Sequence, residues 1–219
     1  MNDSLRPKTI VGMPAYNEAI YIGSLVLQAK QYADEVLVVD DGSADFTARI
    51  AELAGASVVR HLENKGYGSA IQSILAEAKK RNADILVILD ADSQHNPEEI
   101  LSLIKAISEG SDVVIGSREM QRNAIAPYRR LGQRVLSRLT YIASQKKLSD
   151  TQSGFRAYSR KAIATLELKE KGMAVSSEIV SEASKKGLKV TEVPISVIYT
   201  KDGSTLNPVR HGFGVLNRI

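Results

Sequence analysis

Two acidic side chains follow an apolar run late in the first half of the chain. Asp90 and Asp92 come directly after Ile85–Leu89 and are separated by one residue. Residues two apart in an extended segment point the same way, so these two carboxylates are placed to face one cation. Gln94, two residues further on, supplies a third oxygen. Oxygen ligands favour Mg²⁺ or Mn²⁺ over zinc or copper.

A second acidic pair, Asp40-Asp41, follows another apolar run, Glu35–Val39. A single Asp-x-Asp segment is equally consistent with a capped turn and with a cation site. Two acidic strand ends in one sheet favour the cation site. A hard cation there needs an anionic partner, and a diphosphate is the natural one.

The surrounding elements are predicted to bring these residues to one edge of a sheet. Strands are expected at Thr9–Met13, Glu35–Val39, Ser57–Arg60, Ile85–Leu89 and Asp112–Ile115. Amphipathic helices are expected between them at Ala19–Tyr32, Ala44–Leu53, Gly68–Arg81 and Pro97–Ser108. This alternation predicts an α/β fold with a mostly parallel central sheet and helices on both faces. Ligands of such a sheet gather at the carboxyl ends of its strands.

The regular alternation of predicted strands and helices ends after Gly116. A basic helix is predicted over Tyr128–Gln145, an extended segment over Gly154–Tyr158, a helix over Ser176–Lys186 and a strand or strand pair over Leu188–Tyr199. The sequence shows no repeat, low-complexity tract or linker that would divide it. We therefore expect a single domain over residues 1–219.

The start of the helix expected at Pro97–Ser108 carries capping signals. Asn96 is a favoured N-cap residue, and Pro97 fits the first turn. Glu99 stands three residues after Asn96, as in a capping box. We expect Glu99 to complete that box.

Composition excludes several classes of protein. The chain has 219 residues, of which 43% are apolar and 25% charged, so a globular domain is expected. The absence of cysteine excludes a disulfide framework, thiolate catalysis and Cys-ligated zinc. Neither a Walker motif nor G-x-G-x-x-G follows the first strand, where Met13–Glu18 stands instead. No apolar run approaches the roughly 20 residues that span a bilayer.

Six short motifs occur in the order found in one known family: Pro14-Ala15-Tyr16-Asn17-Glu18, Val39-Asp40-Asp41-Gly42-Ser43, Asn64-Lys65-Gly66, Asp90-Ala91-Asp92, Gly116-Ser117-Arg118 and Ser153-Gly154-Phe155-Arg156. The chain resembles the family 2 glycosyltransferases, which have a GT-A fold (nucleotide-diphospho-sugar transferase, Rossmann-like). Among these it looks most like the dolichol-phosphate mannose synthases. The similarity runs from about Thr9 to Tyr199. It implies a nucleotide-binding half, residues 1–116, and an acceptor-binding half, residues 117–219.

The resemblance implies a role for each matching residue. The residues expected to bind the nucleotide sugar are Pro14, Tyr16, Asn17, Glu18, Asp40, Asp41, Lys65, Gly66, Asp90, Ala91, Asp92, Glu178 and Lys201. Among these, Asp41 is expected to contact base and ribose, and Glu178 to face the donor sugar. Asp90, Asp92 and Gln94 would hold Mg²⁺ or Mn²⁺, and Asp92 and Arg118 would be catalytic. For Tyr16 and Glu18 the alternative is helix entry and capping, and for Glu178 it is an exposed position on the surface.

Arginines are expected to bind the acceptor. Arg118 resembles the residue that grips the phosphate of the acceptor, and Arg130 and Arg134 are expected to assist it. Arg130, Arg134 and Arg138 are four apart and share one face of the predicted basic helix, an arrangement that suits a polyprenyl phosphate or an anionic membrane surface. A solvated basic face is the alternative.

One departure from the family concerns the segment after Val193-Pro194-Ile195. Mannose synthases carry a basic residue and Gly-Ser-Lys there, whereas this chain has Tyr199–Thr205. Lys201 or Arg210 would substitute, so the identity of the donor stays open.

The resemblance implies an inverting, metal-dependent transfer of one hexose from a nucleotide-diphosphate sugar to dolichyl or polyprenyl phosphate. GDP-mannose is the favoured donor and a UDP-sugar the alternative. A phosphate acceptor is already anionic, since its second pKa lies near 6, and needs no catalytic base. The adjacent Glu-Asp residues that usually supply the catalytic base in this family are absent. Ser177-Glu178 stands in that region instead.

Other functions remain as alternatives. The first is a family 2 enzyme acting on a soluble or protein-linked glycan, and the second is a non-catalytic module that binds nucleotide sugars. Processive synthases need a tryptophan that this chain lacks, and nucleotidyltransferases need a Gly-rich basic loop after the first strand. We expect no nucleic-acid partner. We expect a cytoplasmic protein that lies peripherally at the cytoplasmic face of a membrane, with a separate anchoring partner as one possibility.

Overall fold

The computed structural model describes residues 6–120 and 148–198. Within these residues seven strands form one sheet in the order β3-β2-β1-β4-β6-β5-β7. The strands are β1 (Thr9–Ala15), β2 (Glu35–Asp40), β3 (Ser57–Arg60), β4 (Ile85–Ile88), β5 (Val113–Ser117), β6 (Arg156–Ser159) and β7 (Val190–Pro194). The two pairings of β6 are antiparallel, and the other pairings are parallel. The predicted α/β fold with a mostly parallel sheet is confirmed.

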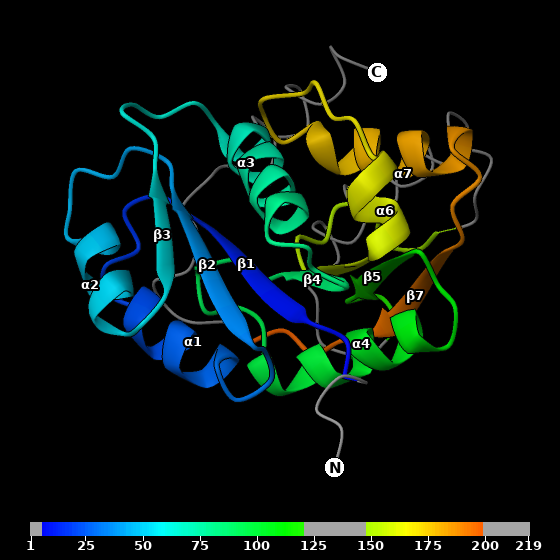
Figure 1. Cartoon of the computed structure of the whole chain (residues 1–219), viewed down its shortest axis with the longest axis horizontal. Coiled ribbons are helices and arrows are strands. Elements are labelled where there is room, and N and C mark those ends of the chain that lie inside the picture. The colour runs from blue at the N-terminus through cyan, green and yellow to red at the C-terminus, as the bar shows by residue number, and fades with distance from the viewer. Residues whose placement is uncertain (1–5, 121–147, 199–219) are drawn as a thin grey trace.

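Helices cover both faces of the sheet (Figure 1). One face carries α1 (Ile22–Ala29), α2 (Thr47–Leu53) and α4 (Ile100–Ser108), and the other carries α3 (Tyr67–Lys80), α6 (Arg160–Thr165) and α7 (Val175–Lys185). Alternate residues of β1 serve the two layers. Val11 and Met13 pack with the first set of helices, whereas Ile10 packs with the second. Burial on both faces explains why the strands read as continuous apolar runs.

The reversed direction of β6 decides what meets at the edge of the sheet. Arg156, the first residue of β6, pairs with Ile88 near the end of β4 and with Ile115 of β5. The segment that precedes β6 therefore lies at the same edge as the segments that follow β1, β2, β4, β5 and β7. Residues 149–155 and the loop at 90–95 are thereby brought together.

Two of the predicted helices begin later than expected. The predictions started at Ala19 and Ala44, but α1 begins at Ile22 and α2 at Thr47. The intervening residues form turns tied by side chains. The backbone N–H of Glu18 donates to Thr47 Oγ1 at 2.8 Å, and that of Ala19 donates to Asp45 Oδ2 at 3.2 Å. These polar contacts override the helical pattern of the sequence.

Of the capping box expected at the start of Pro97–Ser108, the structure forms the Asn96 half but not the Glu99 half. Asn96 Oδ1 accepts a hydrogen bond from the backbone N–H of Glu98, as an N-cap does. The first turn, Pro97–Glu99, is a 3₁₀ helix that leads into α4. Glu99 does not return to Asn96; its Oε1 accepts hydrogen bonds from the backbone N–H and the hydroxyl of Ser196, at 2.8 and 2.9 Å. The capping-box prediction for Glu99 is wrong because the segment after β7 takes its carboxylate.

Some predictions concern residues outside 6–120 and 148–198. The basic helix over Tyr128–Gln145 is one of them. In the described part of the chain, every helix is too short or too polar to cross a bilayer.

Candidate active site

Asp90 lies at the end of β4 with contacts on several sides. Its Oδ1 accepts a hydrogen bond from the Tyr67 hydroxyl at 3.0 Å, and its Oδ2 lies 4.0 Å from Nε2 of His95. Gly154 packs directly against it, because a Cβ atom at that position would lie 2.0 Å from Asp90 Oδ2. The Asp90 side chain still keeps 26% of its exposure. The carboxylate is thus held in a fixed orientation with one side open.

Negative charge accumulates beside Asp90. Burial, together with Asp92, Asp45 and Asp90, raises the pKa of Glu18 to about 7. Burial and the charge of Asp90 also raise the pKa of Asp92. Burial raises the pKa of Asp90 itself, against the hydrogen bond from Tyr67 and nearby arginine charges. Carboxylates that raise the pKa values of their neighbours in this way form a region of negative potential suited to a cation.

The fit of this site to a divalent ion follows from its donor set. No three His, Cys, Asp or Glu side chains among residues 6–120 and 148–198 are grouped so as to enclose a metal ion. Asp90 and Asp92 nonetheless present carboxylate oxygens from one loop, and the loop is fixed by a hydrogen bond from the Gln94 backbone N–H to Asp92 Oδ1 at 3.1 Å. Two carboxylates on an open side suit a cation that completes its coordination with phosphate oxygens and water, as Mg²⁺ does.

The loops after β1 and β2 are tied to each other. Asn17 adopts a φ of 56°. Its backbone N–H donates to Ser43 Oγ at 2.9 Å, and its Oδ1 accepts from the Ala44 N–H at 2.9 Å. Asp40 supports the same loop, since its Oδ1 accepts from the Ser43 N–H at 3.1 Å. The two loops form one unit beside Glu18.

Three other residues expected in the nucleotide site differ in exposure. Pro14 is buried within β1, and Ala91 is buried between the two aspartates. Tyr16 directly follows β1 and is 48% exposed. Pro14 and Ala91 therefore shape the backbone, while Tyr16 presents a side chain.

The carboxylate of Asp41 forms hydrogen bonds within the protein. Its Oδ1 contacts Nδ1 of His61 at 2.6 Å and accepts from the Lys65 N–H at 3.0 Å. Its Oδ2 accepts from the Gly66 N–H at 2.8 Å. Gly66 has a φ of 97°, a conformation that favours glycine, and it is the N-cap residue of α3. Asp41 therefore fixes the loop before α3, and the expected contact with base and ribose stays a prediction.

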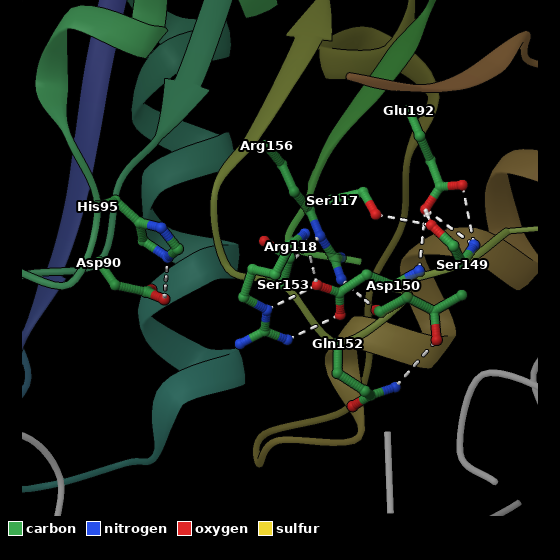
Figure 2. Close-up of polar contacts among 11 residues, drawn as sticks. Asp90, His95, Ser117, Arg118, Ser149, Asp150, Gln152, Ser153, Arg156 and Glu192 are labelled. Carbon is green, nitrogen blue, oxygen red and sulfur yellow. Dashed lines mark hydrogen bonds and ion pairs between the residues drawn. The ribbon is translucent and has the colours of Figure 1, made fainter. Parts of the chain in front are cut away.

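Arg118 follows β5 and forms an ion pair with Asp150. Its Nε lies 2.6 Å from Asp150 Oδ2, and one terminal guanidinium nitrogen lies 2.7 Å from Oδ1. Asp150 is fully buried, and the Arg118 side chain is 20% exposed. Burial is the larger cause of the shifts at both Asp90 and His95: it raises the pKa of Asp90, which the positive charge of Arg118 opposes, and it lowers the pKa of His95 to about 4, to which the charge of Arg118 adds. Arg118 therefore faces the acidic side of the site (Figure 2).

A second arginine is buried behind the site. Arg156 Nε donates to the Ser153 carbonyl at 2.8 Å, and a terminal nitrogen donates to the Thr151 carbonyl at 2.6 Å. Burial raises the pKa of Asp90, and the charge of Arg156 opposes that rise. Arg156 thus shapes the turn at 151–153 and stabilises the Asp90 carboxylate from within.

The remaining predicted residues are placed elsewhere. Glu178 lies on α7, where its two carboxylate oxygens accept hydrogen bonds from the Lys169 and Glu170 N–H groups, each at 2.9 Å. In this structure it holds the loop before α7, and its expected contact with the donor sugar stays a prediction. The predicted site residues Arg130, Arg134 and Lys201 lie outside the described residues, as do Arg138 and Arg210.

Comparison with known proteins assigns the family. The model of the family described as "Glycosyl transferase family 2" matches residues 10–166. The chain belongs to this family. It is a glycosyltransferase with an α/β fold of the GT-A type.

Relatives of this glycosyltransferase carry specific names. It is 35% identical to a UDP-N-acetylglucosamine--dolichyl-phosphate N-acetylglucosaminyltransferase of Methanococcus voltae, over 86% of this chain and 85% of that protein. It is 34% identical to a polyprenol monophosphomannose synthase of Mycolicibacterium smegmatis, over 88% and 79%. Among solved structures, glucosyl-3-phosphoglycerate synthase from Mycobacterium tuberculosis, in complex with Mn²⁺, UDP and phosphoglyceric acid, has a TM-score of 0.77 at 21% identity, covering 97% of this chain and 75% of that one. The last similarity concerns the fold.

Three site residues of the glycosyltransferase were missed by sequence reasoning. Tyr67, which donates a hydrogen bond to Asp90, directly follows the Asn64-Lys65-Gly66 motif, and this proximity was the available signal. Asp150 comes three residues before Ser153, and this proximity to a motif was the available signal. Glu192, which contacts the segment at 149–150, lies in a predicted strand, and no local pattern identifies it.

Proposed function

We propose that this glycosyltransferase transfers one hexose from a nucleotide-diphosphate sugar to a polyprenyl or dolichyl phosphate. The observation that carries the proposal is the placement of Arg118 opposite Asp90 at one edge of the sheet, with Asp92 beside Asp90 in the same loop. An acidic side suits a cation and the diphosphate that it accompanies, and a basic side suits a second phosphate. The names of the two relatives support the same acceptor class.

Asp90 and Asp92, with Gln94, would hold Mg²⁺ or Mn²⁺. When bound there, such an ion supplies positive charge where the leaving nucleoside diphosphate gains negative charge. The protein fixes the orientation of Asp90 through Tyr67 and Gly154 before any ligand arrives. The solved Mycobacterium tuberculosis structure contains Mn²⁺ and UDP, which is consistent with this arrangement.

The nucleotide would lie across the loops after the first strands. Tyr16 after β1, Asn17 and Glu18 in the β1 loop, and the Lys65-Gly66 segment are its proposed neighbours, with residues 1–116 as the nucleotide-binding half. Asp41 keeps the last of these segments in place through the Lys65 and Gly66 N–H groups. The residue that would close over the diphosphate is Lys201.

The acceptor would bind on the other side, in the half formed by residues 117–219. Arg118, with Arg130 and Arg134, would receive its phosphate. Such an acceptor is already an anion, so no residue has to remove a proton from it. The engagement of the Glu178 carboxylate with the loop at 169–170 agrees with a mechanism that needs no base there. Attack on the face opposite the leaving diphosphate gives inversion. The chain's residues contribute positioning and charge neutralisation.

The donor is tested by a panel of nucleotide sugars. GDP-mannose is our favoured donor, and UDP-glucose and UDP-N-acetylglucosamine are included because one relative is named for the latter. Each is supplied with dolichyl phosphate and Mg²⁺ or Mn²⁺, and both nucleoside diphosphate release and glycolipid formation are measured. Asp92→Ala should lower turnover about 10²–10³-fold with an unchanged fold. Asp34→Ala, at the opposite edge of the sheet, is the matched control. Metal-independent activity of Asp92→Ala near the wild-type rate would refute the cation site.

We also propose that the protein lies peripherally on the cytoplasmic face of a membrane, where its acceptor resides, alone or with an anchoring partner. Flotation with anionic liposomes tests this proposal. Binding that weakens as salt rises supports it, and the absence of binding at low salt contradicts it.

A further inference from the structure

Glu192 on β7 makes a concentrated set of hydrogen bonds to one short segment. Its Oε1 and Oε2 accept from the Ser149 N–H at 2.9 and 2.8 Å, and its Oε1 also accepts from the Asp150 N–H at 2.9 Å. The Ser149 hydroxyl contacts the same oxygen at 2.9 Å and lies 2.6 Å from the Ser117 hydroxyl. One carboxylate thus fixes the backbone of two consecutive residues and links them to the end of β5.

The second of these residues determines where Arg118 points. Asp150 meets the guanidinium with both carboxylate oxygens, and its Oδ2 also accepts from the Arg118 backbone N–H at 3.1 Å. Two-point contacts between arginine and a carboxylate fix direction as well as distance. Asp150 is fully buried, so it has little freedom to follow Arg118 elsewhere. Figure 2 shows the series from Glu192 through Ser149 and Asp150 to Arg118.

The charges of the residues from Glu192 to Arg118 give this series an effect on the site as well as on the fold. Glu192 and Asp150 are two carboxylates on adjacent chain segments, and Asp150 pairs with Arg118. The charge of Arg118 acts on Asp90 and His95 across the site. A shift of Asp150 therefore changes where the positive charge of Arg118 lies relative to the acidic side.

We propose that Glu192 is a positioning residue for the acceptor: by holding Ser149 and Asp150 it orients Arg118 toward the phosphate of the polyprenyl substrate. This inference depends on the proposed function, because it assigns the phosphate to Arg118. Glu192 itself is placed to contact the backbone at 149–150. Its effect on the reaction passes through Asp150.

Glu192→Gln tests the proposal with two readouts. The amide keeps the size of the side chain but replaces one acceptor oxygen by a donor that faces backbone N–H groups. With a short-chain polyprenyl phosphate in detergent, the KM for this acceptor should rise about tenfold. The KM for the nucleotide sugar should stay within about twofold, because Asp90 keeps its hydrogen bond from Tyr67 and its contact with Gly154. Glu192→Asp keeps the charge and should restore part of the acceptor affinity.

The second readout needs no substrate. In ¹⁵N spectra of the intact protein, the Nε–H resonance of Arg118, assigned with Arg118→Lys, should be shifted by its bond to Asp150. Glu192→Gln should move this resonance. Asp112→Asn is the matched control: Asp112 also accepts a backbone N–H of the β7 region, that of Lys189, but at the opposite end of β5. It should lower stability and leave both the resonance and the acceptor KM in place.

The outcomes separate this proposal from the proposed function. If the wild type transfers no sugar to polyprenyl phosphate while the resonance moves in Glu192→Gln, the proposed acceptor is wrong and the link between Glu192 and Arg118 stands. If the wild type is active and Glu192→Gln changes neither the acceptor KM nor the resonance, the positioning role is wrong. Equal effects on donor and acceptor KM would also overturn it. Should Glu192→Gln fail to fold, Glu192→Asp gives the same comparison.

Discussion

A Cβ atom on Gly154 would lie 2.0 Å from Oδ2 of Asp90 and 2.5 Å from its Cγ. Asp90 follows β4 and Gly154 precedes β6, at the same end of this antiparallel pair, so the orientation of the Asp90 carboxylate depends on the absence of a side chain at position 154. Asp90 is also bonded to Tyr67 and therefore has little room to yield.

Gly154→Ala should displace Asp90 and lower turnover about a hundredfold or more, with loss of Mn²⁺ binding. The overpacking should cost about 1–3 kcal/mol of stability. Turnover, Mn²⁺ affinity and thermal unfolding are measured together. Gly110→Ala is the control: its φ is 93° and a Cβ there meets nothing within 4 Å, so it should cost stability and leave turnover intact. Wild-type Mn²⁺ affinity in Gly154→Ala would contradict the prediction.

Tyr67→Phe removes one hydroxyl, the donor to Asp90 Oδ1. A group that orients a metal-binding carboxylate affects metal affinity more than stability, so Mn²⁺ affinity should fall about tenfold. The free energy of unfolding should change by about 1 kcal/mol. Electron paramagnetic resonance titration with Mn²⁺ measures the first and chemical denaturation the second. Tyr32→Phe, the same substitution in the segment between α1 and β2, should alter neither metal affinity nor turnover. Unchanged affinity in Tyr67→Phe would contradict the orienting role of the Tyr67 hydroxyl.

Asp41→Ala distinguishes a residue that supports a loop from one that only contacts the base. The substitution leaves the Lys65 and Gly66 N–H groups without their acceptor, which should cost about 2–4 kcal/mol. The KM for the nucleotide sugar should rise as the loop loosens. Ser73→Ala, which removes only a contact with Nε2 of His61, is the milder control. If Asp41→Ala raises the donor KM at full wild-type stability, Asp41 acts as a ligand-contacting residue instead.

Asp112 gives a prediction about pH. Burial alone would raise its pKa, but hydrogen bonds from the Lys189 N–H, the Lys161 ammonium and the Ser159 hydroxyl lower it below the ordinary 3.8. A carboxyl group with a lowered pKa in the folded state stabilises the protein above its unfolded pKa and loses this contribution as pH falls through the folded value. Asp112→Asn should therefore lower stability at pH 7 by about 1 kcal/mol. The wild-type advantage should shrink below about pH 4. Denaturation at pH 7 and pH 3 measures both, and an equal difference at the two values would contradict the assignment.

Sequence reasoning succeeded where residues close in the chain act together. The pair Asp90 and Asp92 follows a buried strand, and position alone placed it at the ligand edge of the sheet. Arg118 was identified from the resemblance to the family, and it directly follows β5 in the structure. What could not be predicted were partners supplied by distant segments. Arg118 meets Asp150, and Glu99 bonds to Ser196, across separations that no local pattern records. The Asp41 carboxylate accepts hydrogen bonds from the loop at 61–66. The residues next to Asp41 in the sequence do not indicate this partner.

The reversed strand β6 has a consequence for how the enzyme matures. Ile88 and Arg156 are paired in the sheet but lie far apart in the sequence, so Arg156 is synthesised well after Ile88. Contacts between residues so distant in the sequence form slowly. Until β6 has been inserted between β4 and β5, Asp90 has neither Gly154 beside it nor Arg156 behind it. A chain still emerging from the ribosome can therefore complete the first parallel strands, yet it gains a working cation site only when the sheet closes.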